Sequence, residues 1–287
     1  MKAPDFLYRR PDSLEEALGL LADNMGSAQV LAGGQSLMPT LNMRLSSPGM
    51  LVDINRIAAL RGIAETATGI RIGALARHYE VLESVLIGEK VPLLAEAMTY
   101  VAHMAVRNRG TTCGSLALAD PSAEVPAVAV LLNAVIHLQS RNGARDVLAR
   151  DFFEGLYATG RRDDEMITGV TFPSAGKGDV FRFSELSRRH GDFAIVGIGV
   201  KAVKNDDMLG AIEAVVFGSE PAPLLVAHET TINRNTRDSD LQDMAQTIAA
   251  GMDPIGNHQG RPETKRHQAA TLISRALSDL RHELGHV

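Results

Sequence analysis

The sequence predicts an α+β protein built from two domains. Three observations support this class: helical and strand-like hydrophobic periods alternate at short spacing, a glycine-rich stretch divides them, and 287 residues provide enough chain for two domains. Hydrophobic residues make up 45% of the chain and charged residues 22%, which is the balance of a globular protein. This composition argues against a disordered chain, a collagen or a coiled coil.

The first half of the chain begins with a helix. Ser13 and Glu16 form a capping-box pattern, and apolar residues follow at helical spacing until the chain approaches Gly26. Short apolar runs and a second helical period follow. We expect strands at 29–32, 50–54, 70–75, 134–139 and 166–172, and helices at 91–106 and 121–133.

The stretch 173–178, which contains two glycines and begins with a proline, is the best linker in the sequence. We therefore place a domain boundary near residue 176. After it, the apolar pattern predicts strands at 193–203 and 211–218 and helices at 238–250 and 264–284.

Charge and hydropathy exclude several classes of function. The net charge is −5 and no basic run is present, so the chain lacks the basic face that nucleic-acid binding requires. No apolar run approaches the 18 residues of a membrane span, and the first ten residues carry charge and proline where a signal peptide would be apolar. We expect a cytoplasmic protein. The one cysteine, Cys113, cannot form an internal disulfide or supply the ligand set of an iron–sulfur cluster.

The segment His282–His286 matches H-E-x-x-H, the helix motif of zinc proteases. A zinc site needs a third protein ligand and an enclosing cleft, whereas this motif ends one residue before the C-terminus and contains Gly285, which weakens a helix. We interpret it as a solvated helix end and expect no metal ligand on this chain.

Two loops rich in glycine and hydroxyl residues are the best candidates for a binding site. Residues 32–36 follow a predicted strand, and residues 110–115 follow a predicted helix. Glycines allow successive backbone N–H groups to face one oxyanion, and Ser36, Thr111 and Ser115 add hydroxyl donors. The residues alone leave two interpretations open: two tight turns, or two loops that grip one diphosphate. The sequence contains no G-x-G-x-x-G, Walker A or G-x-S-x-G motif.

These loops carry a family resemblance. Leu31–Pro39 resembles the first FAD-binding loop, and Val106–Ala117 the second, of the flavoprotein subunits of molybdenum hydroxylases. This family includes the medium subunits of carbon monoxide dehydrogenase and quinoline oxidoreductase and the flavin domain of xanthine dehydrogenase. Further matches occur in chain order at 53–55, 119–124, 151–153 and 187–194.

The resemblance implies a vanillyl-alcohol-oxidase-like (PCMH-type) FAD-binding domain over residues 1–176, with α/β subdomains of about 1–57 and 58–176. It implies a smaller C-terminal α/β domain, an antiparallel sheet with helices, over 177–287. The cofactor-binding residues that it implies lie on several segments. Ala32, Gly33, Gly34, Gln35, Ser36, Leu37 and Met38 would wrap the FAD diphosphate; Thr111, Gly114 and Ser115 would hold it from the other side; Asp120, Glu124, Ile167 and Asp192 would lie near the flavin or ribityl chain.

Three positions qualify the resemblance. The family usually has a glycine where this chain has Cys113, so that side chain must point away from the cofactor or occupy space beside it. Ile195 stands where xanthine dehydrogenases place a lysine near the flavin, so the oxidant preference does not carry over. For Asp192, a simple turn residue after Gly191 is an equally good interpretation.

The resemblance implies an FAD-carrying electron-transfer subunit of a heteromeric molybdenum hydroxylase. It would accept electrons from [2Fe–2S] clusters on a small subunit, work beside a large molybdopterin subunit in a dimer of heterotrimers, and need no catalytic proton-transfer side chain. Two alternatives stay open: a self-contained FAD-dependent oxidase or dehydrogenase with its own small substrate, and a non-catalytic assembly subunit that has lost flavin.

Overall fold

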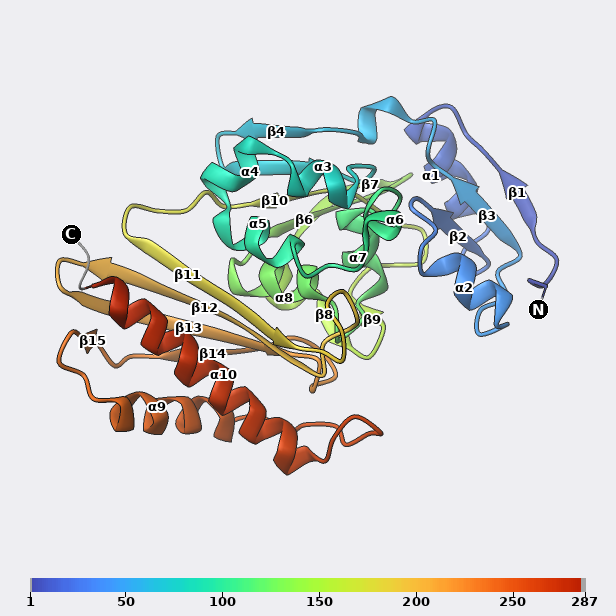
Figure 1. The fold of residues 1–287 in the computed structure, drawn as a ribbon. Helices are drawn as coiled ribbons and strands as arrows, with labels where there is room; N and C mark the ends of the chain where they lie inside the picture. The colour runs from blue at the N-terminus through green and yellow to red at the C-terminus, as the bar shows by residue number, and fades with distance from the viewer. Residues whose placement is uncertain (1, 285–287) are drawn as a thin grey trace.

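In a computed structural model, which describes residues 2–284, three main sheets and a small hairpin carry the helices (Figure 1). The first sheet is parallel, in the order β1–β3–β2, and α1 packs on it. Its elements are β1 (Leu7–Arg9), α1 (Leu14–Asp23), β2 (Ala28–Leu31), α2 (Leu37–Asn42) and β3 (Met50–Asp53).

The second sheet is antiparallel, in the order β4–β5–β10–β6–β7, and its central strand β10 is buried at every residue. A strand buried on both faces has a continuous apolar sequence, so β10 could be predicted from the sequence. The elements of this region are β4 (Ile63–Thr66), β5 (Gly69–Gly73), α3 (His78–Leu82), α4 (Val85–Lys90), α5 (Pro92–Met98), α6 (Met104–Arg107), α7 (Thr112–Leu118), α8 (Glu124–Leu131), β6 (Val135–Ser140), β7 (Gly143–Leu148), β8 (Phe153–Gly155), β9 (Ala158–Thr159) and β10 (Met166–Phe172); single 3-10 turns lie at Ala58–Leu60 and Ala149–Asp151.

The third sheet is also antiparallel and follows the order β11–β12–β13–β14, with β15 added beside β13. Helices α9 and α10 cover one face, while α8 and α5 of the preceding region contact the other (Figure 1). The elements are β11 (Asp179–Leu186), β12 (Val196–Asn205), β13 (Met208–Phe217), β14 (Leu224–His228), β15 (Ile232–Asn233), α9 (Asp238–Ala250) and α10 (Pro262–Glu283).

The side chains of the third sheet contribute to two hydrophobic cores, one on each face of the sheet. Successive side chains of a strand point to opposite faces. Phe183 and Phe217 therefore join the large core around α8, whereas Ile198 and Val216 join the smaller core under α9 and α10. The third sheet is thereby fixed against the helices of the first half of the chain.

Most elements expected from the sequence are confirmed. Ser13 caps α1, because its Oγ accepts a hydrogen bond from the N–H of Glu16 at 3.1 Å. One helix prediction was wrong: the helix expected over 91–106 is two helices, α5 and α6. Ala102 between them adopts a left-handed φ of +45°, which a continuous right-handed helix cannot contain.

Several elements were not expected. They are the strands β1, β4, β7, β8, β9, β11, β14 and β15 and the helices α2, α3, α4 and α7. Every residue of β1 is exposed, and β7 has no fully buried residue. Neither segment therefore shows the alternation of apolar and polar residues that identifies a strand in the sequence. Pairing with a neighbouring strand forms them.

We expect Phe217→Ala to lower the free energy of unfolding by about 3–5 kcal/mol, because it leaves a cavity between the third sheet and the large core around α8. The ring is fully buried, lies 5.6 Å from the ring of Phe183 and fills the space that Gly197 leaves open. Phe193→Ala is the matched control, since that ring is 57% exposed, and its effect should stay within about 0.5 kcal/mol. Equal losses in chemical denaturation would contradict this packing.

Candidate functional site

The first glycine loop, Ala32–Met38, joins the end of β2 to α2. Gly34 has a φ of +71°, which turns the chain sharply and which side chains other than glycine rarely adopt. Within residues 2–284, the backbone N–H groups of Gly33, Gly34, Gln35 and Ser36 donate to no protein acceptor. A row of free N–H groups in a tight turn is a nest for an anion.

The structure brings the second glycine loop against the first. A Cβ built on Gly33 would lie 2.8 Å from the Cα of Gly110 and would collide with the carbonyl oxygen of Arg109. Backbone packs directly on backbone here, so position 33 has room only for glycine. Two segments that were separate in the sequence thus form one surface.

Two polar side chains fasten the loops to each other. The guanidinium of Arg77 donates to the carbonyl oxygen of Arg109 and, at 2.5 Å, to Oδ1 of Asn55. Asn55 in turn donates from Nδ2 to the carbonyl oxygen of Ala32 at 2.9 Å and to Oδ1 of Asp53 at 2.6 Å. Arg77 and Asn55 therefore link both loops to the end of β3.

The second loop leads into α7. The hydroxyl of Thr111 accepts a hydrogen bond from the N–H of Gly114 at 3.1 Å, and a Cβ on Gly114 would lie 2.6 Å from that hydroxyl. Ser115 follows, partly buried. The buried ring of His78 packs on Gly110, and burial together with Arg107 and Arg77 lowers its pKa to about 4. His78 is therefore neutral at physiological pH and adds no charge to the loop.

Cys113 points away from the loop surface into the core. Its side chain is 2% exposed, and its Sγ lies 3.8 Å from the carbonyl oxygen of Ile72 on β5. Burial raises the pKa of the thiol to about 12, so it stays protonated. A side chain replaces the expected glycine here because it packs on the sheet rather than on the loop surface.

Asp120 lies between α7 and α8, Glu124 is the first residue of α8, and both are buried. Asp120 accepts hydrogen bonds from the hydroxyl of Tyr157 at 3.2 Å and from the N–H of Ser122 at 2.9 Å. Burial raises the pKa of Asp120. Burial, with the nearby charge of Asp120, raises the pKa of Glu124 to about 7.

Ile167 and Asp192 occupy different settings. Ile167 is buried on β10 beside an irregularity in its pairing with β6. Asp192 is exposed in a turn, where its N–H donates to the carbonyl oxygen of Arg189 at 3.0 Å. The preceding Gly191 packs against Ala102, so the turn lies beside the entry to α6, but the structure gives the Asp192 carboxylate no hydrogen-bond partner among residues 2–284. The turn interpretation therefore accounts for what is seen of this residue.

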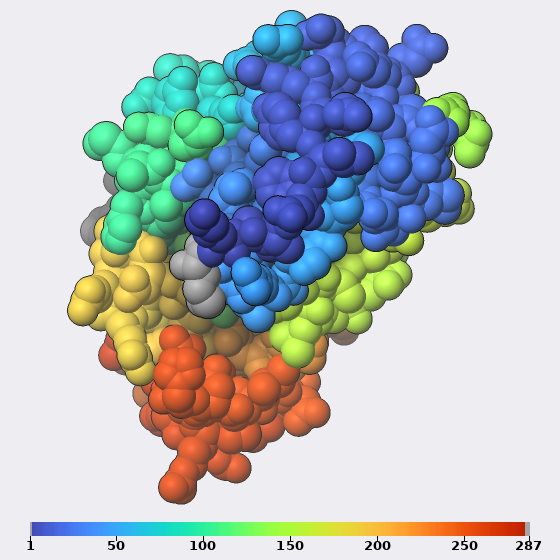
Figure 2. Space-filling model, turned by 90° about the vertical axis from the view of Figure 1, so that its right-hand side faces the viewer, coloured from blue at the N-terminus to red at the C-terminus, as the bar shows by residue number. Residues whose placement is uncertain are grey.

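Segments that are far apart in the sequence lie next to one another on one face of the molecule. In Figure 2 the blue N-terminal region lies above lime and yellow segments, with an orange-red segment below them. Parts of the chain from both sides of residue 176 therefore contribute to this face.

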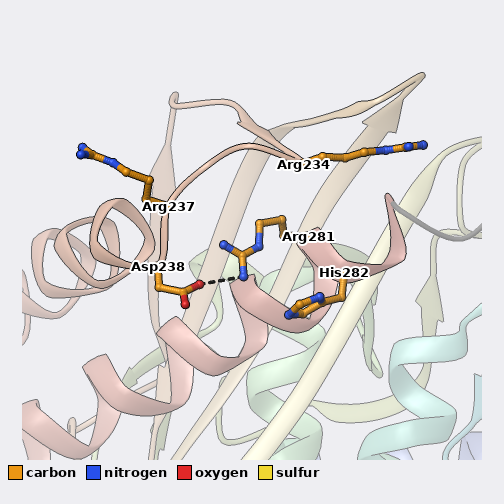
Figure 3. Close-up of a pocket in the computed structure, with 5 residues that line it drawn as sticks. All are labelled: Arg234, Arg237, Asp238, Arg281 and His282. Carbon is orange, nitrogen blue, oxygen red and sulfur yellow. Dashed lines mark ion pairs between the residues drawn. The ribbon is translucent and has the colours of Figure 1, made fainter.

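An open hollow of about 430 Å³ lies elsewhere, between the end of α10 and the start of α9, and Figure 3 shows its lining. Its arginines are already paired: Arg281 with Asp238 at 2.7 Å, Arg237 with Asp240 and Arg234 with Asp207. We do not assign a function to it.

The H-E-x-x-H segment begins at this hollow with His282, while Glu283 pairs with Arg182. Gly285 and His286 lie outside the described residues. Among residues 2–284, no group of three or more histidine, cysteine or carboxylate side chains is placed to hold a metal ion. In the same range, no helix has the length and apolar character needed to cross a bilayer.

Sequence reasoning assigned no role to Arg77, Asn55 or Glu185. Asn55 belongs to a matching segment, but its link to Arg77 depends on tertiary contacts that no local pattern reveals. Glu185 did leave a signal: it continues the alternation of Phe181 and Phe183 on β11, and a carboxylate at an apolar position indicates an unusual environment.

Comparison with known proteins gives two family matches. Residues 4–175 match the model described as FAD binding domain in molybdopterin dehydrogenase, and residues 181–280 match the CO dehydrogenase flavoprotein C-terminal domain.

The chain is 36% identical to the 6-hydroxypseudooxynicotine dehydrogenase complex subunit alpha of Paenarthrobacter nicotinovorans, over 98% of this chain and 96% of that one. It is 32% identical to the carbon monoxide dehydrogenase medium chain of Hydrogenophaga pseudoflava, over 97% and 98%. The crystal structure of quinoline 2-oxidoreductase from Pseudomonas putida 86 superposes with a TM-score of 0.91 at 30% identity, over 99% of both chains. The mixed α/β fold is thus that of these medium subunits.

We expect Gly33→Ala to destabilise the chain by about 1–3 kcal/mol, because the added methyl group must separate the two loops. Gly88→Ala is the matched control: it lies on α4, where a Cβ meets nothing within 4 Å, and alanine should be neutral or stabilising there. Thermal unfolding of both variants measures the difference. If Gly33→Ala proved as stable as the wild type, the direct contact of the loops would be refuted.

Proposed function

The chain belongs to the family of FAD binding domains in molybdopterin dehydrogenases, and we propose that its two glycine loops hold the FAD diphosphate between them. The observation that carries this proposal is the contact of Gly33 with the Gly110 backbone beside four N–H groups that lack protein acceptors. Such a surface fits a diphosphate, since backbone donors at close range can satisfy its oxygens. It also favours a flavin-binding subunit over an assembly subunit that has lost flavin.

In this proposal each segment has its own part of the cofactor. Ala32–Met38 wrap the diphosphate on one side, and Thr111, Gly114 and Ser115 hold it on the other. Asp120 and Glu124 lie along the ribityl chain or the ring, and Ile167 lies near the ring. Asp192 would belong to the segment of the C-terminal domain that faces the flavin.

The protein is an oxidoreductase subunit. Bound FAD would supply the redox chemistry, taking electrons from a donor cluster and passing them to an external acceptor. The residues of the chain fix the position of the cofactor: Arg77 and Asn55 hold the loops together, and the neutral His78 supports Gly110 without adding charge.

We further propose the division of the chain and its location. Residues 1–176 would form a PCMH-type FAD domain with subdomains of about 1–57 and 58–176, and residues 177–287 the C-terminal domain. The family matches at 4–175 and 181–280 support a boundary at this place. A cytoplasmic location is part of the same proposal.

The relatives are named as medium chains or subunits, and we propose that this chain also works in a complex. Its partners would be a small subunit with [2Fe–2S] clusters and a large subunit with the molybdopterin cofactor, in a dimer of heterotrimers. The single cysteine supports this division, because the chain cannot ligate such a cluster itself.

Purified wild-type chain should bind FAD and show flavin absorbance. Gly33→Asp should weaken FAD binding at least about tenfold, equivalent to ~1.4 kcal/mol, because it brings a carboxylate and extra bulk against the diphosphate. Gly88→Asp introduces the same charge on an open part of α4 and should keep wild-type affinity. A fluorescence titration with FAD measures all three. A wild-type chain that cannot be loaded, or equal affinities, would overturn the loop assignment.

Affinity purification of the tagged chain from its native cells should recover two further subunits, together with iron and molybdenum in the complex. The isolated FAD-loaded chain should accept electrons from an artificial one-electron donor but oxidise no small organic substrate. Substrate turnover by the chain alone would instead support the self-contained oxidase or dehydrogenase.

A further inference from the structure

Asp53 is a buried acid to which the proposed function gives no role. It is the last residue of β3, and both of its carboxyl oxygens accept hydrogen bonds. Oδ1 accepts from the backbone N–H of Asn55 at 2.9 Å and from its Nδ2 at 2.6 Å, and Oδ2 accepts from the hydroxyl of Tyr8. Nε of Arg10 lies 3.6 Å from Oδ2. A carboxylate that is surrounded by donors in this way is held in one position.

Packing alone does not explain an acid at this place. The other residues of β3, Met50–Val52, are apolar and buried, so an apolar residue at position 53 would continue the strand at a lower desolvation cost. The neighbouring strand β1 has only exposed residues, yet it pairs with β3, and the hydroxyl of Tyr8 reaches the carboxylate at the end of that strand. Asp53 is therefore kept for its hydrogen bonds.

The donors around Asp53 keep it ionised at neutral pH. Burial raises the pKa of this carboxyl group, but the hydrogen bonds from Tyr8 and Asn55 and the charge of Arg10 outweigh burial and hold the pKa below its ordinary value. An ionised carboxylate accepts hydrogen bonds and donates none. Every polar group that faces Asp53 must therefore turn a donor toward it.

This requirement acts on the side-chain amide of Asn55, which has a donor end and an acceptor end and uses both. Its Nδ2 donates to Asp53 and, at 2.9 Å, to the carbonyl oxygen of Ala32, while its Oδ1 accepts from Arg77 at 2.5 Å. The reversed amide would turn its oxygen toward two acceptors and its NH2 group toward a guanidinium. Only the observed orientation suits all three partners.

We propose that Asp53 is a positioning residue for the two glycine loops. Its carboxylate holds the Asn55 amide in the orientation that attaches Ala32 of the first loop. The same orientation offers Oδ1 to Arg77, whose guanidinium also donates to the carbonyl oxygen of Arg109 in the second loop. The carboxylate has no hydrogen bond to either loop, so it acts through Asn55. This inference rests on the proposed function, in which these loops hold the FAD diphosphate.

The surroundings offset the negative charge of this carboxylate. Arg10 lies beside it, and Arg61 and Arg77 both donate to Asn55, Arg61 to its backbone carbonyl oxygen at 2.8 Å. Glu80 accepts a hydrogen bond from the backbone N–H of Arg77 and adds a second carboxylate. Three guanidinium groups outnumber two carboxylates here, so the positioning group does not place a net negative charge beside a bound diphosphate.

Asp53→Ala tests the proposal, and Asp53→Asn is the conservative variant that should restore wild-type behaviour. Asp53→Ala leaves two donors of Asn55 without an acceptor. Asp53→Asn keeps one oxygen for them and can turn its NH2 group toward the hydroxyl of Tyr8, which can also accept. Asp23→Ala is the matched control, because it removes a carboxylate that pairs with Arg141 at 2.8 Å on the exposed end of α1.

Fluorescence titration of the full-length chains measures their affinity for FAD. We expect Asp53→Ala to weaken FAD binding about tenfold or more, because the loops lose a fixed link. Asp53→Asn and Asp23→Ala should stay within about threefold of the wild type.

A second measurement needs no bound FAD. In NMR spectra of the ¹⁵N-labelled, FAD-free chain, the Nδ2 protons of Asn55 are the side-chain amide signals that Asn55→Asp removes. These protons should exchange slowly with solvent in the wild type and in Asp53→Asn, and about tenfold faster or more in Asp53→Ala. Thermal unfolding of the same samples shows that each variant is folded. A merely structural role would lower the unfolding temperature and leave this exchange unchanged in the folded chain.

The outcomes separate the two proposals. A wild-type chain that binds no FAD refutes the proposed function, while the NMR result still decides whether Asp53 holds Asn55. If FAD binds, wild-type affinity in Asp53→Ala overturns the positioning role, and so do equal losses in Asp53→Ala and Asp53→Asn. Asn55 amide protons that exchange freely in the wild type also overturn it, and this outcome does not depend on the folding of any variant.

Discussion

The contact between the backbones of Gly33 and Gly110 is the constraint on which the site depends. The first loop leaves the parallel sheet, whereas the second lies between α6 and α7, and α7 packs on β5 and β10 of the large antiparallel sheet. Their approach therefore fixes the parallel sheet relative to the antiparallel one. Backbone can approach backbone this closely only where neither segment carries a Cβ in the gap. This approach has an unfavourable free-energy contribution, because it leaves N–H groups of the first loop without protein acceptors. An anion bound there would accept hydrogen bonds from these N–H groups. The same geometry that leaves them without acceptors therefore fits a diphosphate.

Helix α8 connects the glycine-loop region to the third sheet, because it packs against both. All eight of its residues are buried, because the second sheet region lies on one side and the third sheet on the other. Its first residue is Glu124, so the same packing that joins the two halves of the chain also buries an acid. The N–H of Gly218 donates to the carbonyl oxygen of Pro121 at 2.8 Å and ties the end of β13 to the loop before α8. The acidic side of the site is therefore as firmly placed as the glycine side.

The sequence was informative where local chemistry decides structure. Capping and apolar period located α1, the continuous apolar run located β10, and glycine with hydroxyl residues identified both loops. Long-range contacts were not predictable in this way. Arg77 joins Asn55 and Arg109 through tertiary hydrogen bonds, and the helix expected over 91–106 is interrupted between α5 and α6, where Ala102 has a left-handed φ. Glu185 was detectable in principle, since a carboxylate at an inward position of β11 contradicts the pattern around it.

Electrostatics gives the two sides of the site complementary roles. Donor N–H groups, with the Arg77 guanidinium beside the loops, create a surface that attracts negative charge, and the neutral His78 adds no further charge to it. On the other side, ionised carboxylates would repel both a diphosphate and a flavin that gains electrons. Burial removes this conflict, because it raises the pKa of Asp120, of Glu124 to about 7 and of Glu185 to about 8, and so favours their neutral forms.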